Sequence, residues 1–276
     1  IKWWTKQFPE CLYPSIPEKT TDYTERVLIG YEIASNSNVV IAGLCRDNQN
    51  ILPYSLLRLE ALANLFFDAT VCIYENDSVD STPDILMEWS NKTEYENYIT
   101  CKKFNFKKHG SVKTEERIKN MVSVRSNLQN LVRHACKDAD IDYIILIDLD
   151  IEGFSYEGIL NSLSYQFDCM GSNGLIYKEE QDKWKRMYFD SYGSKFIPEK
   201  TDEEKNTTLL HRGESPILVE SAFGGLAIYQ VKAYLNGQYS VGDWERYCEH
   251  IPFHSSMKCF LNPSQITIYN KTRYSL

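Results

Sequence analysis

The sequence Asp142-Tyr143-Ile144-Ile145-Leu146-Ile147-Asp148-Leu149-Asp150 decides the fold of this chain. Its apolar part is uninterrupted and rich in β-branched residues, which predicts a central strand buried on both faces rather than one face of an amphipathic helix. Two carboxylates, one residue apart, follow the strand. Because ligands of open α/β sheets bind outside the carboxyl ends of the strands, we expect a site at this edge.

Asp148 and Asp150 are hard oxygen donors at positions i and i+2, which suit Mn²⁺ or Mg²⁺. The alternative is that they only end a strand in a polar loop. For an isolated D-x-D tripeptide that alternative is the better interpretation, because the tripeptide is common by chance. Its position directly after a buried strand favours the metal site.

The segments before this strand predict a βαβ unit and a second, longer helix. Residues 38–44 and 69–74 form strands, and residues 53–67 between them have helical apolar spacing, so the crossover should be right-handed. An edge strand over residues 98–106 and the longest helix, over residues 113–138, complete the first half.

The segments after it predict shorter elements. We expect a helix over residues 156–163, a strand over 167–171, a charged helix over 179–186 and a last strand over 265–269. The polar stretch 198–214 is the expected mobile loop or lid.

No Pro/Gly/Ser-rich linker divides the 276 residues, and the chain is 43% hydrophobic, which favours one α/β domain with a large core. The predicted sheet is mixed, mainly parallel and flanked by helices. Its formal charge is −8, from 38 acidic and 30 basic residues, without one long basic block. This argues against a general nucleic-acid binder.

No run approaches the roughly 18 to 20 apolar residues that span a bilayer. The chain starts at Ile1 without a methionine, so a signal peptide or membrane anchor upstream is one expectation. Eight cysteines are scattered without a C-x-x-C pair. Most of them we expect as buried free thiols, and a disulfide at Cys11 or Cys259 is the open alternative.

Polar residues with candidate roles follow the predicted strands. Arg46 and Asp47 follow the first strand, where they would contact the nucleotide. Glu75 and Asp77 follow the second strand, where they would contact its base or ribose. For this second loop, a capped, solvated turn is about equally favoured. Arg125 interrupts the apolar stripe of the long helix and could reach a diphosphate or orient the D-x-D carboxylates, with a solvated salt bridge as the alternative.

Two later stretches also stand out. Gly224 and Gly225 lead into an apolar strand, where they allow a close ligand approach or a positive φ, or form a simple bulge. Glu249, His250 and His254 place a carboxylate and two imidazoles within six residues.

Together these features resemble the GT-A fold glycosyltransferases that use nucleotide sugars, over roughly residues 38–269. The stretches that carry the resemblance, in chain order, are Leu44-Cys45-Arg46-Asp47-Asn48, Tyr74-Glu75-Asn76-Asp77-Ser78, Arg125-Ser126-Asn127, Asp148-Leu149-Asp150, Ser172-Asn173-Gly174, Tyr188-Phe189-Asp190-Ser191-Tyr192, Phe223-Gly224-Gly225-Leu226 and Cys248-Glu249-His250 with His254. Among subfamilies, the chain looks somewhat like the surface-glycan transferases of microbes and large viruses, including the fungal capsule mannosyltransferase-like group.

The resemblance implies a Leloir glycosyltransferase that moves a sugar from a nucleoside-diphosphate sugar, uridine favoured over guanosine, to a glycan or glycoconjugate hydroxyl. It implies Mn²⁺ or Mg²⁺ bridging the D-x-D carboxylates and the donor diphosphate. Residues 1–37 would be a lead-in, 38–150 the nucleotide half and 151–276 the acceptor half. Its location would be the secretory lumen, as a type II protein, or the cytoplasm in a microbial or viral glycan pathway.

The implied site is assigned residue by residue. The metal ligands are Asp148, Asp150 and His254, and the catalytic residues are Asp150, Glu249 and His250. Arg46, Asp47, Glu75, Asp77, Arg125, Asp148 and Asn173 would bind the donor, and Asp190, Tyr192, Phe223, Gly224 and Gly225 the acceptor or sugar.

The chain departs from the family where its late acidic motif commonly reads Glu-Asp and here reads Glu249-His250, so the base is open between these two residues. Two other classes of protein remain as alternatives. A nucleotidyltransferase would usually carry a glycine- and basic-rich loop after the first strand, where this chain has Cys45-Arg46-Asp47-Asn48. A non-catalytic glycan-binding relative would be expected to lose the carboxylates.

Overall fold

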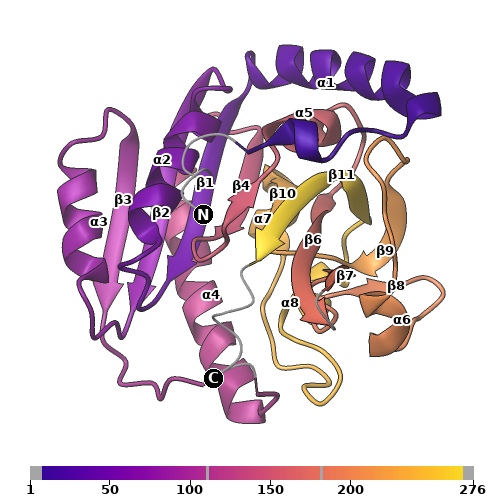
Figure 1. Cartoon of the computed structure of the whole chain (residues 1–276). Helices are drawn as coiled ribbons and strands as arrows, with labels where there is room; N and C mark the ends of the chain where they lie inside the picture. The colour runs from indigo at the N-terminus through magenta and orange to yellow at the C-terminus, as the bar shows by residue number, and fades with distance from the viewer. Residues whose placement is uncertain (1–7, 110–111, 181–182, 270–276) are drawn as a thin grey trace.

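The strand that ends in the two aspartates (β4, Tyr143–Asp148) lies inside one mixed sheet with the strand order β3-β2-β1-β4-β10-β6-β11-β9-β8. The computed structural model describes residues 8–109, 112–180 and 183–269 (Figure 1). Two short strands complete the sheet: β5 pairs with β11, and β7 pairs with β6. The first seven residues of the expected lead-in lie outside the described residues.

The nucleotide half alternates strands and helices. Its elements are β1 (Asn38–Cys45), α2 (Leu52–Ala63), β2 (Asp68–Asn76), α3 (Thr82–Ser90), β3 (Glu96–Lys102), α4 (Glu115–Ala135) and β4. β1 pairs in parallel with both β2 and β4, and β3 pairs in parallel with β2 at the edge of the sheet. The expected βαβ unit and edge strand are therefore confirmed.

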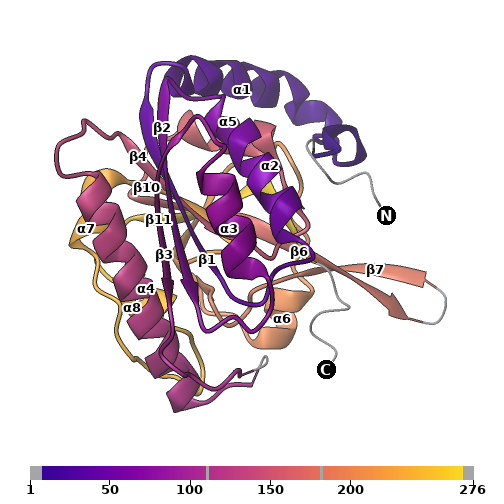
Figure 2. The same cartoon turned by 90° about the vertical axis from the view of Figure 1, so that its left-hand side faces the viewer.

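The chain changes direction across the sheet between β1 and β4. It moves outward through β2 and β3, with α2 and α3 on one face, and α4 then carries it back over the other face to β4 (Figure 2). This is the topological switch point, where the carboxyl ends of neighbouring strands leave a crevice for ligands. Asp148 and Asp150 follow the strand on one side of that crevice.

Both faces of β1 and β4 are buried, as the continuous apolar run predicts. Side chains at alternating positions enter two separate cores because successive residues of a strand point to opposite faces. The core on the α2, α3 and α5 side contains Val39, Ile41, Ile145 and Ile147. The core on the α4 and α7 side contains Val40, Ala42, Ile144 and Leu146.

Residues 151–269, the expected acceptor half, have shorter helices and mostly antiparallel pairing. Their elements are β5 (Gly153–Phe154), α5 (Tyr156–Leu163), β6 (Cys169–Glu180), β7 (Lys183–Tyr188), β8 (Lys195–Phe196), α6 (Asp202–Asn206), β9 (Ile217–Ser221), β10 (Leu226–Gln230), α7 (Val231–Asn236), α8 (His250–His254) and β11 (Cys259–Tyr269). The exception is β6, which pairs in parallel with β11. The predicted mixed α/β fold, with its longest ladders parallel and helices on both faces, is confirmed.

The segment before β1 contains two 3-10 helices, Glu10–Leu12 and Pro17–Lys19, and then α1 (Thr20–Ala34). Glu10 joins this segment to the body of the protein, because its carboxylate accepts a hydrogen bond from Ser155 and forms an ion pair with Arg212. The Ser155 hydroxyl also caps α5 by accepting from the amide of Gly158 at 2.8 Å.

Two expectations for the acceptor half need correction. The charged helix predicted over residues 179–186 is instead the end of β6 and most of β7, which pair as an antiparallel hairpin; residues 181–182 lie outside the described residues. Pairing with a neighbouring strand overrides local helix propensity here. The predicted lid over residues 198–214 is anchored, since Lys205 in α6 is buried and donates to the carbonyls of Ser191 and Ser194.

Across the described ranges, no helix is both long enough and apolar enough to cross a bilayer.

Candidate active site

The turn that carries Asp150 is fixed on both sides by hydrogen bonds to its backbone. The amide of Asp148 donates to the carbonyl of Gly225 at 2.9 Å. From α2, Ser55 Oγ donates to the Leu149 carbonyl at 2.7 Å and Arg58 Nη1 to the Ile151 carbonyl at 3.1 Å. The two carboxylates are therefore presented by a rigid turn.

Arg125, on α4, is the central cation of the site. Its Nη2 lies 3.3 Å from Asp148 Oδ1, and its Nε lies 3.2 Å from Glu249 Oε1. The guanidinium is buried and lies 5.0 Å from the centre of the Phe223 ring. Burial disfavours its charge, but the two carboxylates outweigh that effect and raise the pKa of Arg125 above its ordinary value.

Asp190 lies in the turn after β7, with a φ of +77°, and faces the same site from the acceptor half. Its Oδ1 accepts from the Gly193 amide at 3.1 Å and its Oδ2 from the Gly224 amide at 2.9 Å. Burial raises the pKa of Asp190 to about 6, and the negative charge of Glu249 adds to the shift, against the hydrogen bonds and Arg125.

Asp148 has the most perturbed of these carboxyl groups. Burial raises its pKa to about 7; Arg125 opposes the shift, while the charges of Asp150 and Asp190 add to it. We call Asp148, Asp150, Asp190 and Glu249 the carboxylate cluster.

The carboxylate cluster fits a divalent cation. Its donors are oxygens, which Mn²⁺ and Mg²⁺ prefer. Arg125 pairs with Asp148 and Glu249, and beyond the effect of burial the neighbouring negative charges add to the raised pKa values of Asp148 and Asp190. A cation near Asp148 and Asp150 would offset this excess of negative charge.

The predicted nucleotide-binding residues after β1 and at the end of β2 bind other parts of the loops around them. Asp47 accepts from the Val79 amide and pairs with Lys108, and Glu75 accepts from the Ser78 amide. Arg46 donates to the Phe106 carbonyl. These bonds shape the loops beside the crevice.

Asp77 is also bound within the protein. Its carboxylate accepts from the amides of Phe104 and Asn105, both at 2.7 Å, and from Asn76. Burial tends to raise its pKa, but these hydrogen bonds outweigh burial and lower it. Asp77 therefore holds the segment after β3 against the loop after β2.

Two other predicted contact residues have protein partners. Asn173 is buried in β6, and its side-chain amide donates to the Pro263 carbonyl. The Tyr192 hydroxyl donates to the Trp244 carbonyl, and its own carbonyl accepts from the Cys248 amide. Tyr192 thus secures the segment that leads to Glu249.

The adjacent glycines are required by the backbone, which confirms the expected alternative of a positive φ; their contact with donor or acceptor stays a prediction. Gly224 and Gly225 have φ values of +60° and +82°. A Cβ at Gly224 would lie 2.2 Å from the Ser172 carbonyl oxygen, and one at Gly225 would lie 1.9 Å from the Tyr269 hydroxyl. The space beside them is occupied by backbone and by Tyr269.

Tyr269 is a site residue that the sequence reasoning missed. Its hydroxyl donates to Asp148 Oδ2 at 3.3 Å, and its ring stacks on Phe189 with centroids 3.7 Å apart. The only sequence signal is an aromatic residue at the end of the last predicted strand, which does not distinguish it from the other tyrosines.

The two histidines differ in their surroundings. His250 is buried and stacks on Phe223, with ring centroids 4.3 Å apart, and neither of its ring nitrogens has a hydrogen-bond partner among the described residues. Burial and then Arg125 lower the pKa of His250 well below its ordinary value, so its ring is neutral at pH 7.

His254 does not join Asp148 and Asp150, which corrects its predicted role as a third ligand there. Its Nδ1 lies 2.7 Å from Ser221 Oγ, and its Nε2 lies 3.0 Å from the Tyr229 hydroxyl. α8 ends deep beneath the sheet, so its last side chain points into the protein core.

The chain has a mixed sheet with carboxylates at its topological switch point, which is the arrangement that the GT-A fold predicts. It belongs to the family described as Cryptococcal mannosyltransferase 1, whose model matches residues 38–265. A comparison with curated protein sequences found no match.

Several solved structures are similar in fold. GalNAc-T7 with UDP, GalNAc and Mn²⁺ matches with a TM-score of 0.48 and 10% identity, over 95% of this chain and 54% of that one. The mannosyltransferase PcManGT of Pyrobaculum calidifontis, with GDP-Man and Mn²⁺, has a TM-score of 0.48 and 11% identity, over 93% of this chain and 68% of its own. S. aureus TarS 1-349 has a TM-score of 0.46 and 9% identity, over 84% of this chain and 60% of its own. This chain thus spans less than two thirds of TarS 1-349 and of GalNAc-T7.

Proposed function

We propose that this chain transfers a sugar from a nucleoside-diphosphate sugar to a hydroxyl of a glycan or glycoconjugate, with Mn²⁺ or Mg²⁺ bound at Asp150 and Asp148. The observation that carries the proposal is the carboxylate cluster at the switch point between β1 and β4, where Arg125 joins residues from both halves. When bound, the cation supplies positive charge that offsets the charge developing on the leaving nucleoside diphosphate.

The chain's own residues hold the reacting groups in place. Arg125 and Tyr269 each bind one oxygen of Asp148, which fixes the orientation of that carboxylate. Fixing a ligand before the substrate arrives removes the entropy cost of ordering it during the reaction. Asp190 holds the Gly224 amide, so the turn between β9 and β10 keeps its place beside Asp148.

Glu249 is the proposed base for the acceptor hydroxyl if the enzyme inverts the anomeric centre, and it orients the acceptor if the enzyme retains it. Its bond to Arg125 ties its position to that of Asp148. The neutral ring of His250, on the next residue, packs against Phe223 and supports this arrangement. The raised pKa of Asp190 and its place beside Glu249 make Asp190 the second candidate for the base.

The donor nucleotide is open to test. The sequence-based preference for uridine rests on no specific contact in the structure, whereas the family is described as a mannosyltransferase. We therefore propose a nucleoside-diphosphate mannose as the first donor to test, with uridine-diphosphate sugars as the alternative.

The experiment measures release of nucleoside diphosphate by the purified chain, with and without Mn²⁺, from GDP-mannose and from a set of UDP-sugars. Asp150→Asn keeps the size of the side chain and removes its charge, so metal-dependent release should fall roughly 100- to 1000-fold. Asp138→Asn, at an exposed position after α4, is the matched control and should retain the wild-type rate.

Thermal unfolding provides a reading that does not depend on turnover. The matching nucleoside diphosphate should raise the melting temperature only when Mn²⁺ is present, because a ligand that binds only the folded state stabilises it. Metal-dependent release that persists unchanged in Asp150→Asn would contradict the proposed metal site.

A further inference from the structure

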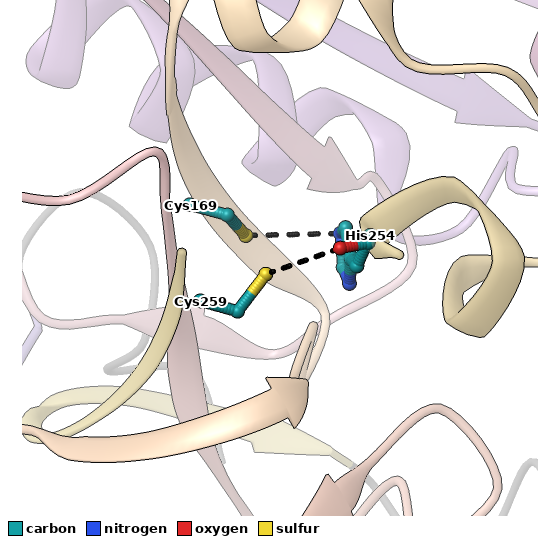
Figure 3. A group of neighbouring side chains, drawn as sticks. All are labelled: Cys169, His254 and Cys259. Atoms are coloured by element: carbon teal, nitrogen blue, oxygen red, sulfur yellow. Dashed lines mark hydrogen bonds between the residues drawn. The ribbon is translucent and has the colours of Figure 1, made fainter. Parts of the chain in front are cut away.

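A second group of metal-ligand side chains lies in the core on the α4 and α7 side of the sheet, and none of its members belongs to the carboxylate cluster. Cys169 is the first residue of β6, Cys259 the first of β11, and His254 the last of α8 (Figure 3). Their ligand atoms all lie within 4.8 Å of one another, and all three side chains are buried. We call them the thiol-histidine cluster.

The parallel pairing of β6 and β11 creates this cluster. Cys169 and Cys259 are direct partners in the ladder, although 90 positions separate them in the sequence, so their side chains leave the sheet on the same side. His254 precedes Cys259 by five positions, and the short connection from α8 to β11 brings its ring back over the two thiols. No C-x-x-C or H-x-C spacing announces this arrangement in the sequence.

The hydrogen bonds around His254 fix its tautomer. Ser221 Oγ donates its single proton to the Gly193 carbonyl at 3.0 Å. Ser221 must therefore accept from His254 Nδ1, 2.7 Å away, so Nδ1 carries the ring proton. The lone pair of Nε2 then faces Cys169 Sγ, 3.7 Å away, and the Tyr229 hydroxyl, 3.0 Å away.

We propose that Cys169, Cys259 and His254 bind a Zn²⁺ ion, with Tyr229 or a water molecule in the fourth position. Two thiolates and an imidazole are a ligand set that zinc prefers. Zinc bonds of about 2.3 Å to sulfur and about 2.0 Å to nitrogen, at a tetrahedral angle, separate the two ligand atoms by about 3.5 Å. The observed 3.7 Å between Cys169 Sγ and His254 Nε2 matches this separation.

The surroundings meet two further requirements of a zinc site. A metal-bound histidine normally donates its other ring nitrogen to a fixed acceptor, and Ser221 is that acceptor here. When the ion binds, the two thiols release their protons, and the charge of the cation cancels that of the two thiolates in the protein interior.

An open pocket leads to the cluster. Its volume is about 600 Å³, and His254 and Cys259 form part of its wall, together with Lys195, Tyr247 and Lys258. The ion would therefore enter through this pocket. The proposed role is structural. The ion would join β6 and β11 to the last residue of α8. Because α8 begins directly after Glu249, the ion would also fix the position of this carboxylate.

The first measurement is the metal content of the full chain produced with added zinc and dialysed afterwards. We expect close to one zinc per chain. Cobalt substitution should give the thiolate-to-metal charge-transfer bands and the intense visible bands of a tetrahedral site. These two readings use the wild-type chain, so they decide the proposal even where a variant does not fold.

Variants then locate the ion. Cys259→Ser and His254→Gln should lose most of the zinc, whereas Cys72→Ala, at a buried cysteine in β2, should keep it. Asp150→Asn should also keep it, which separates this site from the carboxylate cluster. A wild-type chain that binds neither zinc nor cobalt overturns the proposal, as does a Cys169–Cys259 disulfide found by mass spectrometry or zinc retained in full by Cys259→Ser.

Discussion

The carboxylate cluster and the thiol-histidine cluster lie in the same domain but present opposite chemistry. The first consists of hard oxygen donors at the carboxyl edge of the sheet, next to the crevice where ligands of α/β folds bind. The second consists of sulfur and imidazole donors beneath the sheet, reached through a separate pocket.

The two clusters also differ in how their charge is balanced. In the carboxylate cluster, buried Arg125 offsets part of the negative charge; burial raises the pKa of Asp148, and the charges of Asp150 and Asp190 add to that shift. In the thiol-histidine cluster, burial raises the pKa of Cys169 and lowers that of His254 to about 3, so both side chains are neutral at pH 7 until a metal ion binds. The difference indicates that the first cluster is formed for a charged ligand and the second for a buried ion.

The largest expected effect follows from removing Arg125. Arg125→Met would leave the carboxylates of Asp148 and Glu249 without their shared cation, and loss of one partner of a buried ion pair costs roughly 3–5 kcal/mol. Urea unfolding should show this loss of stability. The double variant Arg125→Met with Glu249→Gln should recover part of the lost stability, because only the Asp148 carboxylate is then buried without its cation.

The zinc content of Arg125→Met tests whether the carboxylate cluster and the thiol-histidine cluster depend on each other. If folded Arg125→Met retains its zinc while losing stability, the two clusters are independent. Equal loss of zinc and stability would show that the position of α8 couples them.

Gly225→Ala should be next in size. Alanine at a φ of +82° is strained by about 1–3 kcal/mol, and its Cβ would also displace the Tyr269 hydroxyl from Asp148. We expect lower stability in urea and weaker binding of Mn²⁺ than in the wild type.

Gly213→Ala is the matched control for this substitution. Its φ is +91°, but the nearest atom to a new Cβ is 3.0 Å away, on Lys19, and far from both clusters. It should lose stability through backbone strain and keep its affinity for Mn²⁺. Equal weakening of Mn²⁺ binding in both variants would show that the Tyr269 hydroxyl does not contribute to Mn²⁺ binding.

Tyr269→Phe should have a smaller effect. It removes one hydrogen bond to Asp148, which is worth about 0.5–1.5 kcal/mol, so the transfer rate should fall a few-fold while the fold is retained. Tyr177→Phe, which removes a hydrogen bond to Tyr13 elsewhere, is the control and should leave the rate unchanged.

A last prediction concerns the effect of pH on stability without added Mn²⁺. The pKa values of about 7 for Asp148 and about 6 for Asp190 exceed the unfolded value of 3.8, so the folded state holds more protons between about pH 4 and 7. Their contribution to the free energy of unfolding is therefore present at low pH and is lost as the pH rises through this window.

Added Mn²⁺ should reverse this trend, because the cation binds the ionised carboxylates and competes with protons. The difference in melting temperature with and without Mn²⁺ should therefore grow from about pH 5 to about pH 8. A difference that stays constant over this range would show that neither carboxyl group titrates with the metal.

Much of the nucleotide half could be predicted from the sequence. The continuous run before Asp148, the helical spacing before the second strand and the stripe on α4 depend on local periodicity, which the structure preserves. The acceptor half was harder, since the charged segment near residue 180 became strand by pairing with its neighbours. Its short elements have too few residues for a clear period.

The roles of individual side chains were less predictable than the elements that carry them. Asp77 was expected to contact the nucleotide, and the structure shows it bound to backbone amides of the segment after β3. The sequence shows that a carboxylate follows a strand. It does not show which amides will face that carboxylate, because these come from a segment nearly thirty residues away.

The sequence by itself determined the mainly parallel core and the presence of Asp148 and Asp150 at the carboxyl end of its central strand. These follow from hydrophobic periodicity and chain order, which are local properties. Only the tertiary structure decided that Arg125 joins Asp148 to Glu249, that Tyr269 fills the space beside Gly225, and that His254 meets Cys169 and Cys259 instead of the aspartates. Each of these contacts joins residues that are far apart in the sequence. Whether they touch depends on the register of the sheet or on the path of an irregular segment, and no local sequence pattern encodes either.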